Sequence, residues 1–488
     1  MRLGFQHSYC ALPSRFYARV KPTPVTSPQL VVFNQALASD LGLEADSLER
    51  EAAAVFSGNE LPEDADPIAM VYAGHQFGGF VPRLGDGRAI LLGEIKGHDG
   101  ILRDVQLKGA GLTPFSRNGD GRAALGPMLR EYLISEAMHA RGIPSTRSLA
   151  VVTTGEQVFR ESVLPGAVLT RVAASHVRVG TFQYFAARGD QDALRELLAY
   201  VISRYYPAAR DAPVPALQVL KEVTARQLAL VADWMLLGFI HGVMNTDNMS
   251  ICGETIDYGP CAFMDNYDPS TVFSSIDHNG RYAYANQAAI AQWNLARFAE
   301  TLLPLIDADP ERAVRLATDV VEPFIDQFDA RILSGMRRKI GLASARDDDA
   351  ELIRRLLNAM QQSQADFTLT FRRLALAAES PAGQTLLCEL FGADTEINAW
   401  LQDWRQRLAC DPQPACERLD GMRAVSPAFI PRNHRVQAAL NAAEAGDYGA
   451  LHKLLAVVQR PYQEQPLAAE YAQPPAPSER VLQTFCGT

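Results

Sequence analysis

The spacing of hydrophobic residues divides the chain into a part with short hydrophobic runs and a part with long helical repeats. Between about residues 68 and 172 the runs are short, as at 89–92 and 104–108, and glycine-rich turns separate them. After about residue 190, hydrophobic residues recur with the period of an α-helix over 191–204, 215–242, 285–306, 310–341, 348–378 and 383–408. The pattern predicts an α+β fold, with a mostly β N-terminal lobe and a larger helical C-terminal lobe.

One amphipathic helix is predicted inside the β lobe. Pro127 suits the first turn of a helix, and Leu129, Leu133 and Ala137 then follow at intervals of four residues. A β lobe followed by a helical lobe implies a cleft between the two, where a small molecule could bind.

The chain divides into four parts: an N-terminal extension, the β lobe, the helical lobe and a C-terminal part, with bounds 1–67, 68–172, 173–420 and 421–488. The last part begins with helices and continues into a proline-rich stretch over residues 459–480. That composition disfavours helix and strand and is typical of an extended arm. A short tail containing Cys486 follows the arm.

Composition and charge limit the partners of the protein. The 488 residues include 46 Lys and Arg against 56 Asp and Glu, which gives a net charge of −10, and 48% of them are hydrophobic. This describes a folded protein without a broad cationic surface for DNA or RNA. Nucleic acid is therefore not expected as a partner.

The cysteines and the hydrophobic stretches bear on location. The 7 cysteines form no Cys-x-x-Cys pair, which disfavours a disulfide scaffold or a zinc ribbon and favours a reducing compartment. The first 20 residues lack the hydrophobic core of a secretory signal. The longest hydrophobic stretch, 231–244, is interrupted by Asp233 and His241 and is too short for a bilayer. We expect a cytoplasmic protein without a membrane partner.

Two glycine-rich segments, Gly74–Gly79 and Gly85-Asp86-Gly87-Arg88, suit a phosphate site, because backbone without side chains lets amide groups approach phosphate oxygens. A plain hairpin is the alternative, since Asp-Gly before a hydrophobic run is a strong hairpin signal.

Lys108 and Glu131 are candidates for an ion pair that touches phosphate. Lys108 ends a strand in which Val105 and Leu107 share one face, so that Gln106 and Lys108 point to the other. Glu131 lies in the first turns of the predicted helix, and the intervening residues allow a strand, a loop and a helix start. The alternative is a solvated lysine and a surface glutamate that never meet.

Oxygen ligands are concentrated between residues 241 and 259. Asn248 and Asp257 could supply the amide and carboxylate oxygens that magnesium prefers, which leaves Asp247 to accept a proton from a hydroxyl group. An Asx-rich turn without chemistry is the alternative. His241 has no second histidine at ligand spacing and is interpreted as a hydrogen-bonded structural residue.

Arg171 and Arg178 lie between the two lobes, and a pair of forked guanidinium groups suits a polyphosphate. A solvated charge pair is the ordinary alternative.

Taken in chain order, the glycine-rich loop, the strand lysine, the helix glutamate, the Asp-Asn loop and the Asp-x-Gly turn resemble a protein-kinase fold. More narrowly, the sequence resembles the selenoprotein O family of protein adenylyltransferases. The resemblance is most specific from about Tyr72 to Asn286 and is carried by AGHQFGGFVPRLGDGRA, QLKGAG, SRNGDGRAAL, LREYLISEAMHARGIP, TRVAASHVRVGTF, GFIHGVMNTDNMSICGETIDYGPCAFMD and GRYAYANQ.

The resemblance implies a protein-kinase-like two-lobed fold and a set of site residues. It implies Asp247 as the catalytic base, Asn248 and Asp257 as ligands of Mg²⁺ or Mn²⁺, and Glu131 as the residue that positions the lysine. It also implies that the ATP-binding residues are Gly85, Gly87, Arg88, Lys108, Asp120, Gly121, Arg171 and Arg178.

The implied activity is the transfer of AMP from ATP to Ser, Thr or Tyr hydroxyls of proteins, with self-modification included and with ATP reversed relative to kinases. Arg88, Lys108, Arg171 and Arg178 over-supply the site with cations, which fits β and γ phosphates held deep in the cleft and an α phosphorus at its entrance. Ordinary phosphoryl transfer and a non-catalytic nucleotide-binding scaffold are the alternatives. The intact Asp247, Asn248 and Asp257 argue against the scaffold.

The resemblance also bears on the tail and on location. Many eukaryotic members of this family carry a selenocysteine near the C-terminus and are mitochondrial, whereas this chain has Cys486 and no evident transit peptide, which favours the cytoplasm of a bacterium. Cys486 is a candidate redox handle, and a harmless exposed thiol is the alternative. In some relatives the tail bonds a cysteine in the loop after the metal-binding turn, but this chain has Val272-Phe273-Ser274 there.

Overall fold

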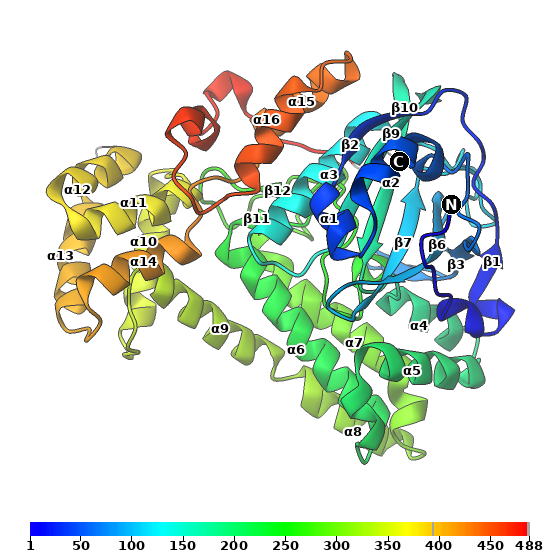
Figure 1. Ribbon diagram of the computed structural model, residues 1–488. Helices are drawn as coiled ribbons and strands as arrows, with labels where there is room; N and C mark the ends of the chain where they lie inside the picture. The colour runs from blue at the N-terminus through cyan, green and yellow to red at the C-terminus, as the bar shows by residue number, and fades with distance from the viewer. Residues whose placement is uncertain (393–394, 486–488) are drawn as a thin grey trace.

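The computed structural model describes residues 1–392 and 395–485, with an antiparallel sheet in the N-terminal part and helices in the C-terminal part (Figure 1). The sheet lies on one side of the molecule, and the helices that follow it in sequence extend away to the other side. This confirms the predicted mixture of a β part followed by a helical part.

The sheet is built around four long strands, β6 (Ala89–Lys96), β7 (Leu102–Lys108), β9 (Arg147–Phe159) and β10 (Val163–Ala173). The shorter strands are β1 (Tyr17–Arg19), β2 (Gln29–Phe33), β3 (Ile68–Met70) and β8 (Ala123–Ala124). The order is β1-β3-β6-β7-β10-β9-β2, and β8 pairs with β10. Two of these strands, β1 and β2, come from residues 1–67, so this segment is part of the sheet.

Hydrophobic side chains alternate between the two faces of the sheet, as expected for strands. Val105 and Leu107 of β7 are buried in one cluster with α1 (Gln35–Asp40) and α2 (Ala45–Phe56). Gln106 and Lys108 are thereby directed to the opposite face, which α3 (Leu125–Ala140) covers. The predicted alternation in this strand is confirmed.

The helix α3 is not amphipathic, which corrects the prediction from its repeat. Thirteen of its residues are buried, among them Arg130 and Glu136 as well as the predicted Leu129, Leu133 and Ala137. The sheet covers one side of this helix, and α15 (Asn433–Glu444) and α16 (Gly449–Val458) from the far end of the chain cover another. Local periodicity could not reveal this second cover.

The helical part begins with α4 (Val179–Ala186), α5 (Gln191–Tyr205), α6 (Pro215–Leu236) and α7 (Gln287–Ile306). The remaining helices are α8 (Pro310–Val321), α9 (Phe324–Lys339), α10 (Asp349–Gln362), α11 (Phe367–Glu379), α12 (Pro381–Cys388), α13 (Glu396–Ala409) and α14 (Ala415–Val425). The helices predicted over 310–341, 348–378 and 383–408 are therefore each two helices, and the helix predicted over 215–242 ends early.

Local backbone chemistry explains these helix ends. Pro323 separates α8 from α9 because it has no amide hydrogen to continue a helix. Gln364, Gly392 and Gly238 have φ values of 51°, 60° and 72°, a left-handed conformation that ends a right-handed helix. The hydrophobic period continues across these breaks because both helices of each pair face the same core.

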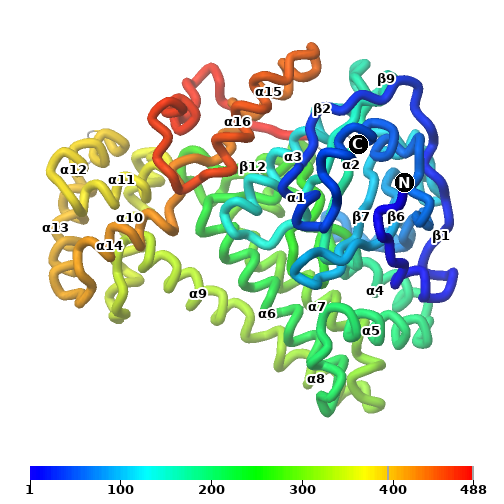
Figure 2. The backbone as a smooth tube through the Cα atoms, viewed as in Figure 1, coloured from blue at the N-terminus to red at the C-terminus, as the bar shows by residue number. Residues whose placement is uncertain are grey.

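Two large hydrophobic cores lie in the described helical part. The larger one joins the α3 face of the sheet to α4–α9, α15 and α16. The second lies among α9–α14 and contains the stacked pair Trp400 and Trp404. In the tube view α9 leads from α6 and α7 toward this second group (Figure 2).

The proline-rich stretch runs back over the molecule and holds two short 3₁₀ helices, Pro466–Ala472 and Pro477–Glu479. Beyond it, the Thr484 hydroxyl donates to the Pro260 carbonyl at 2.6 Å, and the Thr484 amide donates to the Phe273 carbonyl at 2.8 Å. The described part of the tail thus lies against the loop of residues 272–274 through hydrogen bonds, although that loop has no cysteine. Cys486 lies outside the described residues, and the redox hypothesis stays a prediction.

None of the helices in the described ranges is long and apolar enough to cross a membrane.

A buried ion triad ties the C-terminal part to the helical part. Arg432 is 1% exposed, and its guanidinium donates to Asp265 at 2.7 Å and to Asp366 at 2.6 Å. We predict that Arg432→Ala lowers the free energy of unfolding by about 3–5 kcal/mol, because it leaves two carboxylates without their cation.

The matched control is Arg435→Ala on α15, whose guanidinium lies 4.0 Å from the exposed Glu470 carboxylate and donates to the Glu470 backbone carbonyl at 3.1 Å. Its cost should be below about 1 kcal/mol. Denaturant unfolding measures both changes, and equal costs for the two variants would contradict the prediction.

Candidate functional site

Lys108 and Glu131 form the predicted ion pair. Lys108 is the last residue of β7, and its ammonium donates to Glu131 of α3 at 2.7 Å. Glu131 is 1% exposed and Lys108 is 7% exposed. The alternative of a solvated lysine and a surface glutamate is therefore excluded.

Arg171 and Arg178 join the same group of charges. Arg171 lies in β10 opposite Gln106 of β7, and it donates to Glu131 through Nε and to Asp257 through Nη2. Arg178 precedes α4 and donates to Asp257 Oδ2 at 2.9 Å. Both arginines are buried, so the alternative of a solvated pair is wrong.

Asp257 is the residue on which these cations converge. Its Oδ1 also accepts from the Lys108 ammonium at 3.2 Å, so three cations contact one carboxylate. Burial alone would raise the pKa of Asp257, but Arg171, Lys108 and Arg178 outweigh it and hold the pKa well below its usual range. The Asp257 side chain is 21% exposed, more than its partners, so the cluster opens to solvent at this residue.

Glu131 is the second anion of the cluster. Burial raises its pKa, and Arg171 and Lys108 more than compensate, so the pKa lies below its usual value. Three cations therefore share two ionised carboxylates in direct contact. A buried site with this ratio of charges suits a further anion, such as a phosphate group.

Asp247 occupies a different environment. Its backbone carbonyl accepts from Arg178 at 2.7 Å, whereas its carboxylate makes one side-chain hydrogen bond, from Gln76 at 3.2 Å. The other carboxylate oxygen is buried and has no partner among the described residues. Burial raises the pKa of Asp247 to about 6. A carboxylate with this pKa can accept a proton near neutral pH.

The first glycine-rich segment forms a hairpin against the loop that carries Asp247. The hairpin pairs β4 (Gly74–Gln76) with β5 (Gly79–Val81). The amide of His75 donates to Thr246 at 2.7 Å, and that of Phe77 donates to Asn245 at 3.1 Å. The hairpin given as the alternative for this segment is therefore confirmed, and these two amides bind the loop instead of a phosphate group.

The second glycine-rich segment lies near the cluster. Gly85 has a φ of 80°, and a Cβ at this position would meet the Phe115 ring at 2.5 Å. Thr113 donates to the carbonyl of Asp86 at 2.6 Å, which holds the turn against the next loop. The Arg88 carbonyl accepts from Gly109 at 2.7 Å, which places Arg88 beside the end of the strand that carries Lys108.

Asp120 and Gly121 lie outside the cluster. Asp120 is exposed and pairs with Arg160 at 2.9 Å. The Gly121 carbonyl accepts from Gly111 at 3.0 Å. The structure thus brings together Lys108, Glu131, Arg171, Arg178 and Asp257, and it gives Asp120 a different partner.

Asn248 and Asp257 offer oxygen donors that fit Mg²⁺ by type. The Asn248 amide nitrogen donates to Val243 at 3.1 Å, which directs its amide oxygen away from that carbonyl. The described residues contain no group of three or more His, Cys, Asp or Glu side chains that could hold a metal ion. One amide and one carboxylate oxygen suit an ion whose remaining ligands are phosphate and water.

Sequence reasoning missed several polar residues that support the site: Tyr72, Gln76, Asp86, Gln106, Asn245 and Tyr282. Gln106 links Asp86 at 3.2 Å to Arg171 at 3.5 Å, and its place on the Lys108 face of the strand was a usable signal. Tyr72 lies 4.6 Å below the Arg178 guanidinium, and no local pattern indicates that contact.

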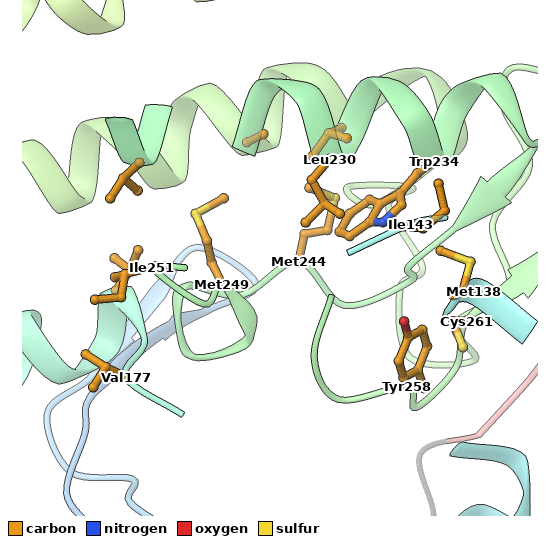
Figure 3. Packing of buried hydrophobic residues seen from close by; sticks show 14 of the residues in the cluster. Met138, Ile143, Val177, Leu230, Trp234, Met244, Met249, Ile251, Tyr258 and Cys261 are labelled. Atoms are coloured by element: carbon orange, nitrogen blue, oxygen red, sulfur yellow. The ribbon is translucent and has the colours of Figure 1, made fainter. Parts of the chain in front are cut away.

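Hydrophobic packing fixes the loop that carries Asp247 and Asp257. Met244, Met249, Ile251 and Tyr258 are buried together with Trp234 of α6 (Figure 3). The polar residues between these anchors are thereby held at the sheet.

His241 belongs to the same buried loop. Burial lowers the pKa of its ring, and Nε2 bonds the Ile256 carbonyl at 2.9 Å, which fits the predicted structural role.

Comparison with known proteins shows which family the sequence matches. Residues 1–459 match the family described as protein adenylyltransferase SelO. The chain is 61% identical over 485 residues to a protein nucleotidyltransferase YdiU of Rhizobium meliloti (strain 1021), with 99% of each chain covered. It is 58% identical over 486 residues to a protein of the same name from Rhodopseudomonas palustris (strain BisB5), again with 99% of each chain covered.

The contact between the hairpin and Asp247 leads to a prediction about Gly74. A Cβ at Gly74 would lie 2.3 Å from Asp247 Oδ1, whereas a Cβ at Gly79 would have its nearest neighbour at 3.5 Å. We predict that Gly74→Ala separates the hairpin from the loop and lowers the free energy of unfolding by about 1–3 kcal/mol.

Amide hydrogen exchange at His75 and Phe77 reports this separation, because both amides are bound to the loop. Gly74→Ala should lose their protection and Gly79→Ala should keep it. Full protection in both variants would show that the hairpin is not held through this contact.

Proposed function

Because the chain belongs to the protein adenylyltransferase SelO family, it is a protein adenylyltransferase with ATP as substrate, and we propose that the cluster around Asp257 is its active site. The observation that carries this proposal is the convergence of Lys108, Arg171 and Arg178 on one carboxylate that opens to solvent.

The triphosphate binds where the cations are densest. Lys108, Arg171 and Arg178, with Arg88 beside the strand end, hold the β and γ phosphates in the buried part of the cluster. Low dielectric strengthens each of these contacts. The α phosphorus then faces the open side, where an acceptor hydroxyl arrives. The glycines at 85 and 87 let the backbone turn approach the nucleotide.

Glu131 acts as a positioning residue. It binds Lys108 and Arg171 at the same time and so fixes two phosphate-binding side chains relative to each other. Asp120 and Gly121 form an outer wall of the nucleotide site in this proposal, since they lie outside the ion cluster.

Asp247 is the catalytic base. The acceptor oxygen attacks the α phosphorus, the bond from that phosphorus to the bridging oxygen breaks, and pyrophosphate leaves with the bond electrons. The proton of the acceptor hydroxyl moves to the carboxylate of Asp247, whose raised pKa suits this transfer.

Asn248 and Asp257 would hold Mg²⁺, or Mn²⁺ in its place, through their oxygen atoms. When bound, the ion neutralises charge on the phosphates. The cations that Asp257 now holds are then available to the triphosphate.

In this proposal the chain has a protein-kinase-like fold, and ATP binds in a reversed orientation relative to kinases. A strand lysine paired with a helix glutamate, and an Asp-Asn loop followed by Asp257, support this assignment. The two lobes span 68–172 and 173–420 in this proposal, with the extensions 1–67, which adds β1 and β2 to the sheet, and 421–488. The proposed location is the cytoplasm, and the proposed acceptors are Ser, Thr and Tyr hydroxyls, including those of the protein itself.

Removal of the Lys108 side chain tests the proposed phosphate site. Lys108→Ala leaves Glu131 bound to Arg171 and Asp257 bound to both arginines, so the fold should remain intact. Loss of a cation at the phosphates should reduce transfer by at least about 100-fold. The measurement follows label from α-labelled and from γ-labelled ATP into protein.

Lys96→Ala is the matched control, because Lys96 is exposed at the end of the neighbouring strand β6, and it should transfer as the wild type does. Label from γ without label from α would contradict AMP transfer. Full activity of folded Lys108→Ala would remove this lysine from the site.

The dependence of AMP transfer on pH tests Asp247 as the base. With a pKa of about 6, Asp247 is protonated at lower pH and cannot accept a proton. The rate of AMP transfer at low acceptor concentration should rise about tenfold per pH unit below this value and level off above it. Initial rates from about 1.5 pH units below this pKa to about two units above it, roughly pH 4.5 to 8, measure the profile.

Asp247→Asn should abolish AMP transfer, and with it the rise of the rate with pH. Asp233→Asn changes a carboxylate outside the cluster, paired with Arg331 on α9, and should keep the wild-type profile. A flat profile for the wild type across this range would exclude Asp247 as the base.

A further inference from the structure

The β4–β5 hairpin presents an outward surface beside Asp247. Phe77 and Phe80 are 37% and 40% exposed, which is unusual for large aromatic side chains. Phe80 packs on His75 with 4.9 Å between ring centroids, and Phe77 packs on Tyr282 at 5.0 Å. We call Phe77, Phe80, Arg83, Arg188 and Arg281 the hairpin surface.

The hairpin surface lies next to the proposed base. Gly74 packs directly against Asp247, because a Cβ at this position would meet the Asp247 carboxylate. Gly74 pairs with Val81 across the hairpin. Gln76 of the same strand donates to Asp247. The hairpin thus borders Asp247, so a protein segment that brings a hydroxyl group to this carboxylate would lie beside it.

The three arginines of the hairpin surface lie at the tip and at the base of the hairpin. Arg281 lies at the tip, with its guanidinium 3.6–3.8 Å from a Cβ position at Gly78 and stacked on Trp293 at 4.9 Å. Arg188 lies at the base, where it donates to the Pro82 carbonyl at 3.1 Å. Arg83 follows Pro82 directly.

Arg83 and Arg188 are exposed and Arg281 is half-buried, and none of the three has a carboxylate within 4.0 Å in the described parts of the chain. Arginines elsewhere on the surface, such as Arg195, Arg354 and Arg355, do have such a partner. The chain as a whole carries a net charge of −10, so acidic side chains are abundant elsewhere. A patch of uncompensated cations on an acidic protein is therefore a local feature, complementary to an anionic partner.

We propose that the hairpin surface binds the acceptor protein and selects hydroxyl groups that have an acidic residue nearby in sequence and an apolar side chain beside it. The acidic residue pairs with Arg281 or Arg188, and the apolar side chain covers Phe77 or Phe80. This inference rests on the proposed function, since it takes Asp247 as the place where the acceptor hydroxyl reacts.

The test maps acceptor sites. Wild type, Arg281→Glu and Arg405→Glu each receive α-labelled ATP and a native cell lysate, and the modified residues are identified by mass spectrometry. Arg405 is exposed on α13, at the opposite side of the molecule from α4, against which the hairpin packs (Figure 1). Its substitution makes the same charge change away from the hairpin surface.

We expect acidic residues to be enriched near the sites that wild type and Arg405→Glu modify. Arg281→Glu should label those sites about two- to fivefold less, the size of one exposed ion pair, with an unchanged KM for ATP. Equal labelling by all three enzymes, or sites flanked mainly by basic residues, would overturn the inference.

A charge exchange separates loss of recognition from loss of folding. In one mapped acceptor, the acidic residue is replaced by lysine; Arg281→Glu should then label this variant better than the original acceptor, and wild type should do the reverse. The same preference in both enzymes would overturn the inference. Complete absence of α label with wild type is a different result, because it overturns the transfer activity itself and the inference with it.

Discussion

The contact of three cations with the Asp257 carboxylate is the interaction on which the rest of the site depends. Lys108 and Arg171 come from the sheet, Arg178 precedes α4, and Asp257 comes from the loop after α6. The carboxylate therefore joins the β part to the helical part at the proposed nucleotide site. A buried charge group of this kind is costly unless each member is paired, so its geometry is strongly constrained.

The same arrangement explains why the pKa values of two carboxylates in the site differ. Asp257 lies among cations and keeps a pKa well below its usual range, whereas burial raises the pKa of Asp247 to about 6. The first is suited to hold positive charge and the second to accept a proton. The hairpin contributes to this difference, because Gly74 and Gln76 exclude water from Asp247.

The sequence allowed the Lys108 and Glu131 pair to be predicted because strand alternation and helix placement are local patterns. It also indicated Arg171 and Arg178, although their burial required the tertiary structure. The docking of the hairpin on Asn245 and the cover of α3 by C-terminal helices depend on contacts between distant segments, and no local periodicity encodes them. The helix breaks at Pro323 and Gly392 had local signals, but the continuing hydrophobic period outweighed them.

The proposed site implies competition between Asp257 and the triphosphate for the same three cations, until a divalent ion occupies the carboxylate. Isothermal titration of ATP into wild type and Asp257→Asn, with Mg²⁺ and with EDTA, tests it directly. Asparagine tolerates the φ of 61° at this position, so the backbone is preserved. In EDTA the variant should bind ATP more tightly than wild type does, and Mg²⁺ should reverse this order. An equal loss of affinity in the variant under both conditions would contradict it.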